Sequence, residues 1–337
     1  MKALLRVGVV VMAACFGLAP VARAETVTLL GGPVGGVWYI VAAGMAKIIH
    51  DSYPDILVRV EPGGAVTNPA RVSQGTADFA LAISTPTVMA LRGTGVYHES
   101  FPNIQAIGFG FAPSYVQVIC TKNFPYPSFE SAIKAKYAMR IAAPSTATLG
   151  DLMMQQMLQH YGVTPDMVHQ WGGNVSFVSH NQQQDLMRNG QANVLMTLLP
   201  APGTDISLVA SSINVKFLPL SDSLLNMFVK EDATELSTLD HSVYPDVIPA
   251  GEKVNTIVID SGLIVSPKVP EQTVYKVTRA LFEHADEVAK IHPSIGAFVP
   301  ADLARPGSRG NGAIPLAPGA EQYFKEMKYD YKVASDK

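Results

Sequence analysis

The clearest sign of the architecture is the stretch TVTLLGGPVGGVWY, residues 26–39. Its first five residues are leucines and β-branched residues, which is typical of a buried strand. The glycine pairs that follow indicate a turn, and the apolar residues of 37–50 recur at helical spacing. We expect a strand, a glycine turn and a helix. Four residues of this helix are expected to face inward: Ala42, Ala43, Ala46 and Ile49.

The same order of elements continues along the chain. Residues 55–61 form the next expected strand, and the turn PGG (62–64) leads into a helix that opens near Thr67. Residues 78–83 form a third strand. Strands that alternate with helices across glycine turns indicate parallel βαβ units, so the sequence predicts an α/β protein.

The N-terminus has the features of a secretory signal peptide. Lys2 and Arg6 precede a 12-residue apolar stretch (7–18), and Ala22-Arg23-Ala24 supplies the small residues that a signal peptidase selects. The stretch is too short to span a membrane. We expect residues 1–24 to be removed and the mature protein to be periplasmic. A retained N-terminal anchor and lipid attachment at Cys15 are the alternatives.

Removal of these residues leaves a chain of 313 residues, which is long for one domain of ~100–200 residues. An internal repeat also favours two lobes. RVSQGTADFA (71–80) resembles LMRNGQANVL (186–195), because each ends a helix at a glycine and then enters an apolar strand.

Two crossings between the lobes can be placed from the apolar strands. We place the first near residues 112–115 and the return in a single strand, 256–266. The first lobe would then hold residues 25–113 plus 256–337, including a helix over 271–291, and the second residues 114–255. No linker rich in Gly and Ser separates them, which favours a stiff hinge of crossing strands.

Charge and cysteine content exclude several classes of function. The mature chain has 22 basic and 28 acidic residues, a net charge of −6, which argues against nucleic acid or an anionic membrane as a partner. We expect a monomer. Cys120 is the only cysteine left, and it lies in the apolar run 115–120. We expect a buried structural thiol rather than a reactive one.

Three loops are candidates for ligand binding: GGPVGG (31–36), PGGAVTN (62–68) and PSTAT (144–148). Each follows a strand, carries small residues and opens a helix. Glycine lets a ligand approach the backbone, and unpaired N–H groups at a helix start attract a carboxylate or phosphate. Ligands of open α/β sheets bind at the carboxyl ends of the strands, where these loops lie. For any one loop, a tight turn without a ligand is the alternative.

Side chains near these loops could complete the site. We expect Tyr39 to line a pocket and Trp38 to pack in the core. Ser84 and Thr85 follow the third strand and could offer hydroxyls across the cleft. No arginine lies inside the loops, so carboxylate recognition would rely on backbone N–H groups and hydroxyls. Arg140 is the nearest alternative cation.

Signatures of catalysis and of cofactors are missing from the sequence. The 8 histidines show no metal-ligand spacing, and no Gly-x-Ser-x-Gly elbow occurs. The first loop lacks the acidic partner of a dinucleotide fingerprint and the Gly-Lys-Ser/Thr of a phosphate loop. We therefore expect no enzyme activity, no metal and no cofactor.

In the order and spacing of four segments the chain resembles the TAXI-type solute receptors, the secreted binding proteins of TRAP transporters. These segments are GGPVGGVWY (31–39), GGAVTN (63–68), GTADFA (75–80) and IPLAPGA (314–320). The resemblance covers nearly all of the mature chain. The departures from the family pattern are Ala65 for Ser, Thr146-Ala147-Thr148 for Ser-Gly-Thr, Thr85 for a common Asp, and Ala317 for His.

The resemblance implies the type II periplasmic binding protein fold: two lobes, each with a mixed, mainly parallel sheet flanked by helices, joined by crossing strands at a hinge. It also implies a receptor that captures a small organic anion, a glutamate-like or oxo/dicarboxylic acid, and delivers it to a TRAP-type permease. The ligand-binding residues expected from the loops and the resemblance are Gly36, Tyr39, Gly64, Ala65, Asn68, Ser84, Thr85, Ser145, Thr146 and Thr148.

One further expectation and two alternative functions remain. Replacement of Asn68 by Ala should weaken binding with little loss of fold. An ABC-type receptor for a sulfonate or similar anion would share the fold, although the segment PGAE (318–321) favours the TRAP type. A secreted enzyme on the same fold is the remaining alternative.

Overall fold

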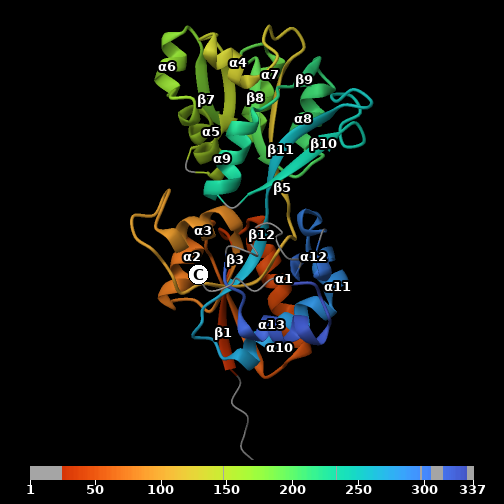
Figure 1. The fold of residues 1–337 in the computed structure, drawn as a ribbon. Coiled ribbons are helices and arrows are strands. Elements are labelled where there is room, and N and C mark those ends of the chain that lie inside the picture. The colour runs from red at the N-terminus through yellow and green to blue at the C-terminus, as the bar shows by residue number, and fades with distance from the viewer. Residues whose placement is uncertain (1–24, 147, 233, 297, 305–313, 332–337) are drawn as a thin grey trace, which may run out of the picture.

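The computed structural model describes residues 25–331 except 147, 233, 297 and 305–313. The expected signal peptide, residues 1–24, lies outside the described residues. The described chain forms two lobes, one above the other in Figure 1, and each is built around its own sheet.

The first lobe holds a mixed sheet in the order β2-β1-β3-β12-β4. Its strands are β1 (Glu25–Leu30), β2 (Ile56–Glu61), β3 (Phe79–Ile83), β4 (Gln105–Phe109) and β12 (Ser261–Val265). Parallel pairs join β1 to β2 and β3, whereas β12 runs antiparallel to β3 and β4. The parallel βαβ units expected over residues 26–83 are thus confirmed.

Helices cover both faces of this sheet (Figure 1). One face packs against α1 (Val37–Ser52), α10 (Glu271–Glu283), α11 (Ala285–Ile291), α12 (Pro300–Ala304) and α13 (Pro318–Glu326), with the turn η1 (Pro293–Ile295) beside them. The other face packs against α2 (Thr67–Gln74) and α3 (Ser84–Arg92). The two cores follow the alternation of the strands, because Phe79 and Leu81 join the first core while Ala80 and Ala82 join the second.

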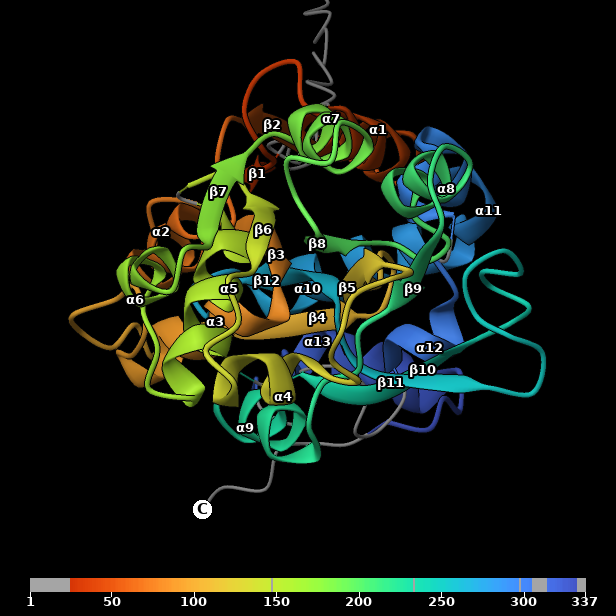
Figure 2. The ribbon, with the colours of Figure 1, turned by 90° about the horizontal axis from the view of Figure 1, so that it is seen from above.

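The second lobe holds a mixed sheet in the order β10-β11-β5-β8-β6-β7, with β9 paired to β5. Its strands are β5 (Ser114–Thr121), β6 (Arg140–Pro144), β7 (Asn174–Val178), β8 (Val194–Leu199), β9 (Val215–Phe217), β10 (Glu235–Asp240) and β11 (Lys253–Ile259). One face packs against α4 (Phe129–Lys134), α5 (Leu149–His160), α6 (Pro165–Gln170) and α9 (Asp222–Asp232). The other carries α7 (His180–Arg188) and α8 (Thr204–Ala210), as Figure 2 shows from above.

Two crossings of the chain connect the lobes. Residues 110–113 lead from β4 to β5, and Asp260 alone separates β11 from β12. Asp260 is fully buried, and its carbonyl accepts a hydrogen bond from the Ser84 N–H at 2.9 Å. Away from the crossings, Arg92 of α3 donates to the carbonyl of Glu231, at the end of α9, at 3.0 Å. The lobes therefore touch beside the hinge as well as through it.

The return crossing differs from the expected single strand over 256–266, because residues 256–259 pair in the second sheet. The helix expected over 271–291 is likewise two helices, which meet at His284. The domain limits that follow from the sequence remain a proposal.

Other expectations about the elements need correction. In α1, Val41, Met45 and Ile48 are buried with Ala42 and Ile49, while Ala43 is exposed. The mixed sheets are confirmed, but parallel pairing does not dominate among the described strands. In the second sheet it joins β6 to β7 and β8, whereas the pairs made by β5 are antiparallel.

Smaller expectations are confirmed. Gly75 and Gly190 have φ values of 72° and 69° and follow the ends of α2 and α7. Cys120 is fully buried in β5, and burial raises the pKa of its thiol to about 12. Among the helices of the described residues, none combines the length and hydropathy of a membrane span.

Candidate functional site

Two of the three candidate loops, those before α2 and α5, line one cavity of 720 Å³ between the lobes. We name it the interlobe cavity. From the first lobe it is lined by the loop before α2, the start of α3 and the loop after α3. From the second lobe it is lined by the first two turns of α5. Its lining residues are Gly64, Ala65, Val66, Thr67, Ile83, Pro86, Met89, Val96, Thr148, Leu149, Asp151, Leu152 and Gln155.

The first-lobe wall continues into a small pocket of 80 Å³, the glycine pocket. It lies at the carboxyl ends of β1, β2 and β3, beside the starts of α1 and α2. Its residues are Gly31, Gly32, Pro33, Trp38, Gly64, Ala65, Asn68, Leu81, Ala82 and Ile83. The backbone N–H groups of Ala65, Val66 and Thr67 make no hydrogen bond to any other described residue. They are the free donors at the start of α2.

Asn68 holds this pocket together. Its Nδ2 donates to the carbonyls of Gly31 at 3.0 Å and Leu81 at 2.8 Å, and its Oδ1 accepts from the Gly64 N–H at 2.9 Å. The side chain is 1% exposed. Its amide is therefore used to fix three segments, so we now expect Asn68→Ala to destabilise the fold as well as to weaken binding.

The close approach between β1 and the loop before α2 depends on Gly63. A Cβ at this position would lie 2.1 Å from Asn68 Oδ1 and 2.9 Å from the Gly31 carbonyl. At the neighbouring Gly64 the nearest atom would be 3.5 Å away. The first glycine is needed for the close approach of β1 and the loop, whereas the second leaves open space toward the cavity.

The second lobe contributes a pocket of 320 Å³, the helix-start pocket. It lies where β6, β7 and β8 end and where α5 and α7 begin. Its residues are Pro144, Ser145, Thr148, Leu149, Gly150, Val178, Ser179, His180 and Leu198. Thr148 caps α5 by accepting from the Asp151 N–H at 3.1 Å, which leaves the N–H groups of Leu149 and Gly150 without a bond to another described residue.

His180 is the titratable side chain of this pocket. Its Nδ1 lies 2.7 Å from Oδ2 of Asp205, which is buried and receives a second bond, at 2.8 Å, from Gln184. The hydrogen bond that His180 donates to Asp205 raises the pKa of His180, against the opposing effect of partial burial. His180 is also the first residue of α7, so a protonated imidazole adds its charge to the helix start.

A third space of 300 Å³ joins these walls nearer the hinge. It is lined by Val37, Trp38, Ile83, Ala112, Ser114, Leu149, Leu198, Pro200, Ile259, Ser261 and Ser294. Ile83 and Leu149 line both this space and the interlobe cavity, and Leu149 also lines the helix-start pocket. The cavities are therefore parts of one cleft. Among the described residues that line it, the titratable side chains are Asp151 and His180.

Five of the ten residues expected at the site line this cleft: Gly64, Ala65, Asn68, Ser145 and Thr148. The other five do not line these four cavities. Gly36 caps α1, Thr146 is exposed, and Ser84 and Thr85 are buried at the start of α3.

Of the two aromatic residues, Trp38 packs against the first-lobe core as expected but also lines the cleft, whereas Tyr39 does not line it. Trp38 lines two of the cavities while packing against Phe111, with 6.1 Å between ring centroids, and Tyr39 lines none of the four. Arg140 lies at the start of β6, opposite its carboxyl end, and donates to the carbonyls of Gln191 and Gly190. It is therefore not the cation of the site.

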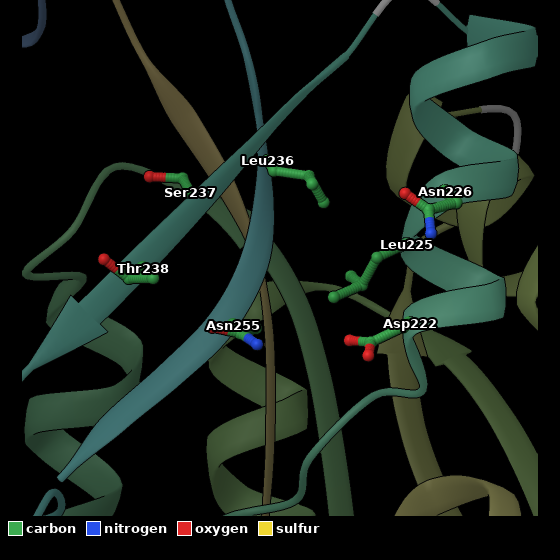
Figure 3. Close-up of a pocket in the computed structure, with 7 residues that line it drawn as sticks. All are labelled: Asp222, Leu225, Asn226, Leu236, Ser237, Thr238 and Asn255. Carbon is green, nitrogen blue, oxygen red and sulfur yellow. The ribbon is translucent and has the colours of Figure 1, made fainter.

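A second large hollow, of 730 Å³, lies outside the cleft (Figure 3). Leu236 of β10 and Asn255 of β11 point toward α9, whose Leu225 and Asp222 face them. Its lining comes from one lobe, and its charged group is a carboxylate, which disfavours an anion. No cluster of three metal-binding side chains is found among the described residues.

Comparison with known proteins agrees with this architecture. The NMT1-like family matches residues 29–327. The periplasmic sulfonate-binding protein SsuA of Methylobacillus flagellatus KT has 12% identity and a TM-score of 0.51, over 94% of this chain and 99% of that one. MatC of Rhodopseudomonas palustris, solved with bound malate, has 16% identity and a TM-score of 0.47, over 92% and 98%.

A third structure, the TctC solute-binding protein from Polaromonas without ligand, has 11% identity and a TM-score of 0.47, over 83% of this chain and 89% of that one. No curated protein matches the chain. The family match spans most of the sequence, and at 12% identity the SsuA structure shows a shared fold. The chain therefore belongs to the NMT1-like family and has the two-lobed α/β fold of periplasmic binding proteins.

Proposed function

We propose that this protein is a periplasmic receptor that captures a small organic anion between its lobes and delivers it to a membrane transporter. The observation that carries the proposal is the interlobe cavity, because residues 64–67 of one lobe and the start of α5 in the other line the same 720 Å³ space. A ligand that contacts both walls stabilises the closed arrangement, and its release allows opening at the hinge.

The preference for an anion rests on the donors of the cleft. Free N–H groups start α2 and α5, and His180 starts α7 beside the same pocket. Each helix start contributes ~0.3–2 kcal/mol toward a negative charge. Among the ten residues expected at the site, Gly64, Ala65, Ser145 and Thr148 are the ones we propose to contact the ligand. Asn68 would act by holding their loop in place.

The resemblance to TAXI receptors supports a TRAP-type permease as the membrane partner and a monomeric receptor. It also makes glutamate-like and oxo/dicarboxylic acids the first compounds to test. An ABC-type sulfonate receptor is the alternative. Uptake that persists when ATP is depleted but stops when the ion gradient is removed would support the TRAP type, and the reverse would support the ABC type.

Binding is best tested on the purified mature chain. Mass spectrometry of the copurifying solute, followed by calorimetry with glutamate, 2-oxoglutarate, succinate and ethanesulfonate, would identify the class of anion. We expect at least one anion to bind with ~micromolar affinity, about −8 kcal/mol. Absence of binding by every anion would contradict the proposal, and chemical conversion of a bound compound would indicate an enzyme instead.

A further inference from the structure

The interlobe cavity is walled mainly by apolar side chains from both lobes. Val66, Pro86, Met89 and Val96 come from the first lobe, and Leu149 and Leu152 from the second. Of the polar groups in the wall, Asp151 accepts a hydrogen bond from Gln155 at 2.6 Å, so these two side chains bind each other. Beyond the free backbone N–H groups at the starts of α2 and α5, a wall of this kind offers a charged group little to replace its water.

Several of these apolar side chains are exposed to solvent. Val66 is 43% exposed and Val96 is 42% exposed, although both lie at the edge of a cleft rather than on an outer face. Val37, which lines the adjoining space, is 36% exposed. A solute with apolar surface would displace water from all three, and this is the contribution that favours binding at such a wall.

The basic side chain that could meet an anion lies at one side of this space. Thr148 and Leu149 line both the interlobe cavity and the helix-start pocket, so the two spaces adjoin there. The pocket holds His180 and the free N–H groups of α5, whereas the lining of the interlobe cavity contains no basic side chain. The basic side chain therefore lies apart from the apolar surface, whose own donors are the backbone N–H groups at the starts of α2 and α5.

We infer that the ligand is an amphipathic monocarboxylate whose carboxylate lies in the helix-start pocket and whose apolar body of several carbons lies in the interlobe cavity. This inference rests on the proposed function and narrows its substrate class. A second carboxylate at the far end of such a ligand would lie among Val66, Met89 and Leu152, on the same wall as Asp151. It would lose its water in exchange for the backbone N–H groups that start α2, with no basic side chain on that wall and with the Asp151 carboxylate beside it.

The inference is tested by calorimetry on the mature chain with two series of acids. The first consists of butanoate, hexanoate and octanoate, and the second of glutarate and adipate. Each added methylene of the monoacids is expected to raise affinity about fourfold, which corresponds to about 0.8 kcal/mol. Hexanoate is expected to bind at least tenfold more tightly than adipate, which has the same number of carbons.

Two variants locate the apolar body, with one matched control. Val96→Asn and Leu152→Asn should each reduce the gain in affinity per methylene. Val96 is an exposed loop residue, so its replacement leaves the core intact. Leu208→Asn changes a leucine that is 48% exposed on α8 and lines none of the four cavities, so it should leave the gain unchanged.

The outcomes separate this inference from the proposed function. Affinity that does not rise with chain length, or adipate that matches hexanoate, would overturn the amphipathic ligand while leaving an anion receptor. Equal gains per methylene in Val96→Asn, Leu152→Asn and Leu208→Asn would also overturn it. If no carboxylate and no sulfonate binds at all, both proposals fail.

Discussion

Ile83 and Leu152 each pack against the core of the opposite lobe. Ile83 ends β3 in the first lobe and contacts the second-lobe core that contains Met153 and Ile257. Leu152 lies on α5 in the second lobe and contacts the first-lobe core that contains Met89. Both side chains also line the interlobe cavity. Contact between the lobes and the shape of the ligand space therefore depend on the same residues.

Replacing Ile83 by Ala is expected to favour opening of the cleft. Truncation of a half-buried isoleucine should remove about 1–2 kcal/mol, below the 2–5 kcal/mol range for a fully buried one. The radius of gyration of the ligand-free variant, measured by X-ray scattering, should exceed that of the parent protein. Ile40→Ala, at a residue 46% exposed on α1, is the control. Equal radii for all three proteins would show that this contact does not hold the lobes together.

Replacing Asn68 by Ala should destabilise the protein by about 3 kcal/mol. Three hydrogen bonds are lost, and two buried carbonyls and one N–H lose their partner. Urea unfolding measures the change. Thr67→Ala is the matched control, because Thr67 is exposed and its hydroxyl makes a single long bond of 3.4 Å. Similar unfolding midpoints for the two variants would contradict the role given to Asn68.

The adjacent glycines should respond differently to a methyl group. Gly63→Ala places a Cβ against Asn68 and the Gly31 carbonyl, so the melting temperature should fall by several degrees. Gly64→Ala meets no atom closer than 3.5 Å and should melt close to the parent protein. Calorimetric melting of both variants tests this, and the opposite order would mean that the loop is packed differently.

His180 should make stability depend on pH. Since its pKa is raised in the folded state by Asp205, its contribution is fully present below the ordinary histidine pKa of about 6.5. The contribution is lost as pH rises through the higher pKa of the folded state. The free energy of unfolding of the parent protein, relative to His180→Gln, should therefore fall as pH rises above about 6.5. His180 is half exposed, so the effect is small.

The control for this experiment is His169→Gln, which changes an exposed histidine on α6 outside the four cavities. Urea unfolding at several pH values provides the measurement. If the difference between the parent protein and His180→Gln stays constant with pH, the pair with Asp205 has no influence on stability in this range.

Much of the fold could be predicted because it depends on local signals. The glycines at 75 and 190 end helices in the left-handed conformation, and the apolar runs between such turns become the strands. The loops before α2 and α5 could be recognised as site walls for the same reason, since a strand, small residues and a helix start occur there in sequence.

The helix-start pocket could be predicted only in part. The strand β7 (NVSFV) is short and half-buried, and without it the start of α7 and His180 have no place in the site. Its alternation of Val175 and Phe177 with polar residues was the available signal. Asp205, which pairs with His180 and raises its pKa, lies on α8, a helix that follows a different strand.

The apolar wall and the role of Asn68 depend on contacts that no local pattern reveals. Met89 and Leu152 have the sequence features of core residues, and each does contact a core while lining the cavity. Asn68 binds Leu81, 13 residues away, and Gly31, 37 residues away. The sequence alone predicts that this amide binds a ligand, because backbone partners so far away in the chain leave no local pattern.

The position of β12 has a consequence for how the protein forms during synthesis. The strands of the second sheet occupy one unbroken segment, 114–259, so they can pair as soon as that segment has left the ribosome. In the first sheet, β4 has β12 as its neighbour, and β12 is made about 150 residues later. The lobe that begins the chain must therefore be the later of the two to assemble, and a nascent chain that stops before residue 261 would hold one finished lobe and one incomplete one.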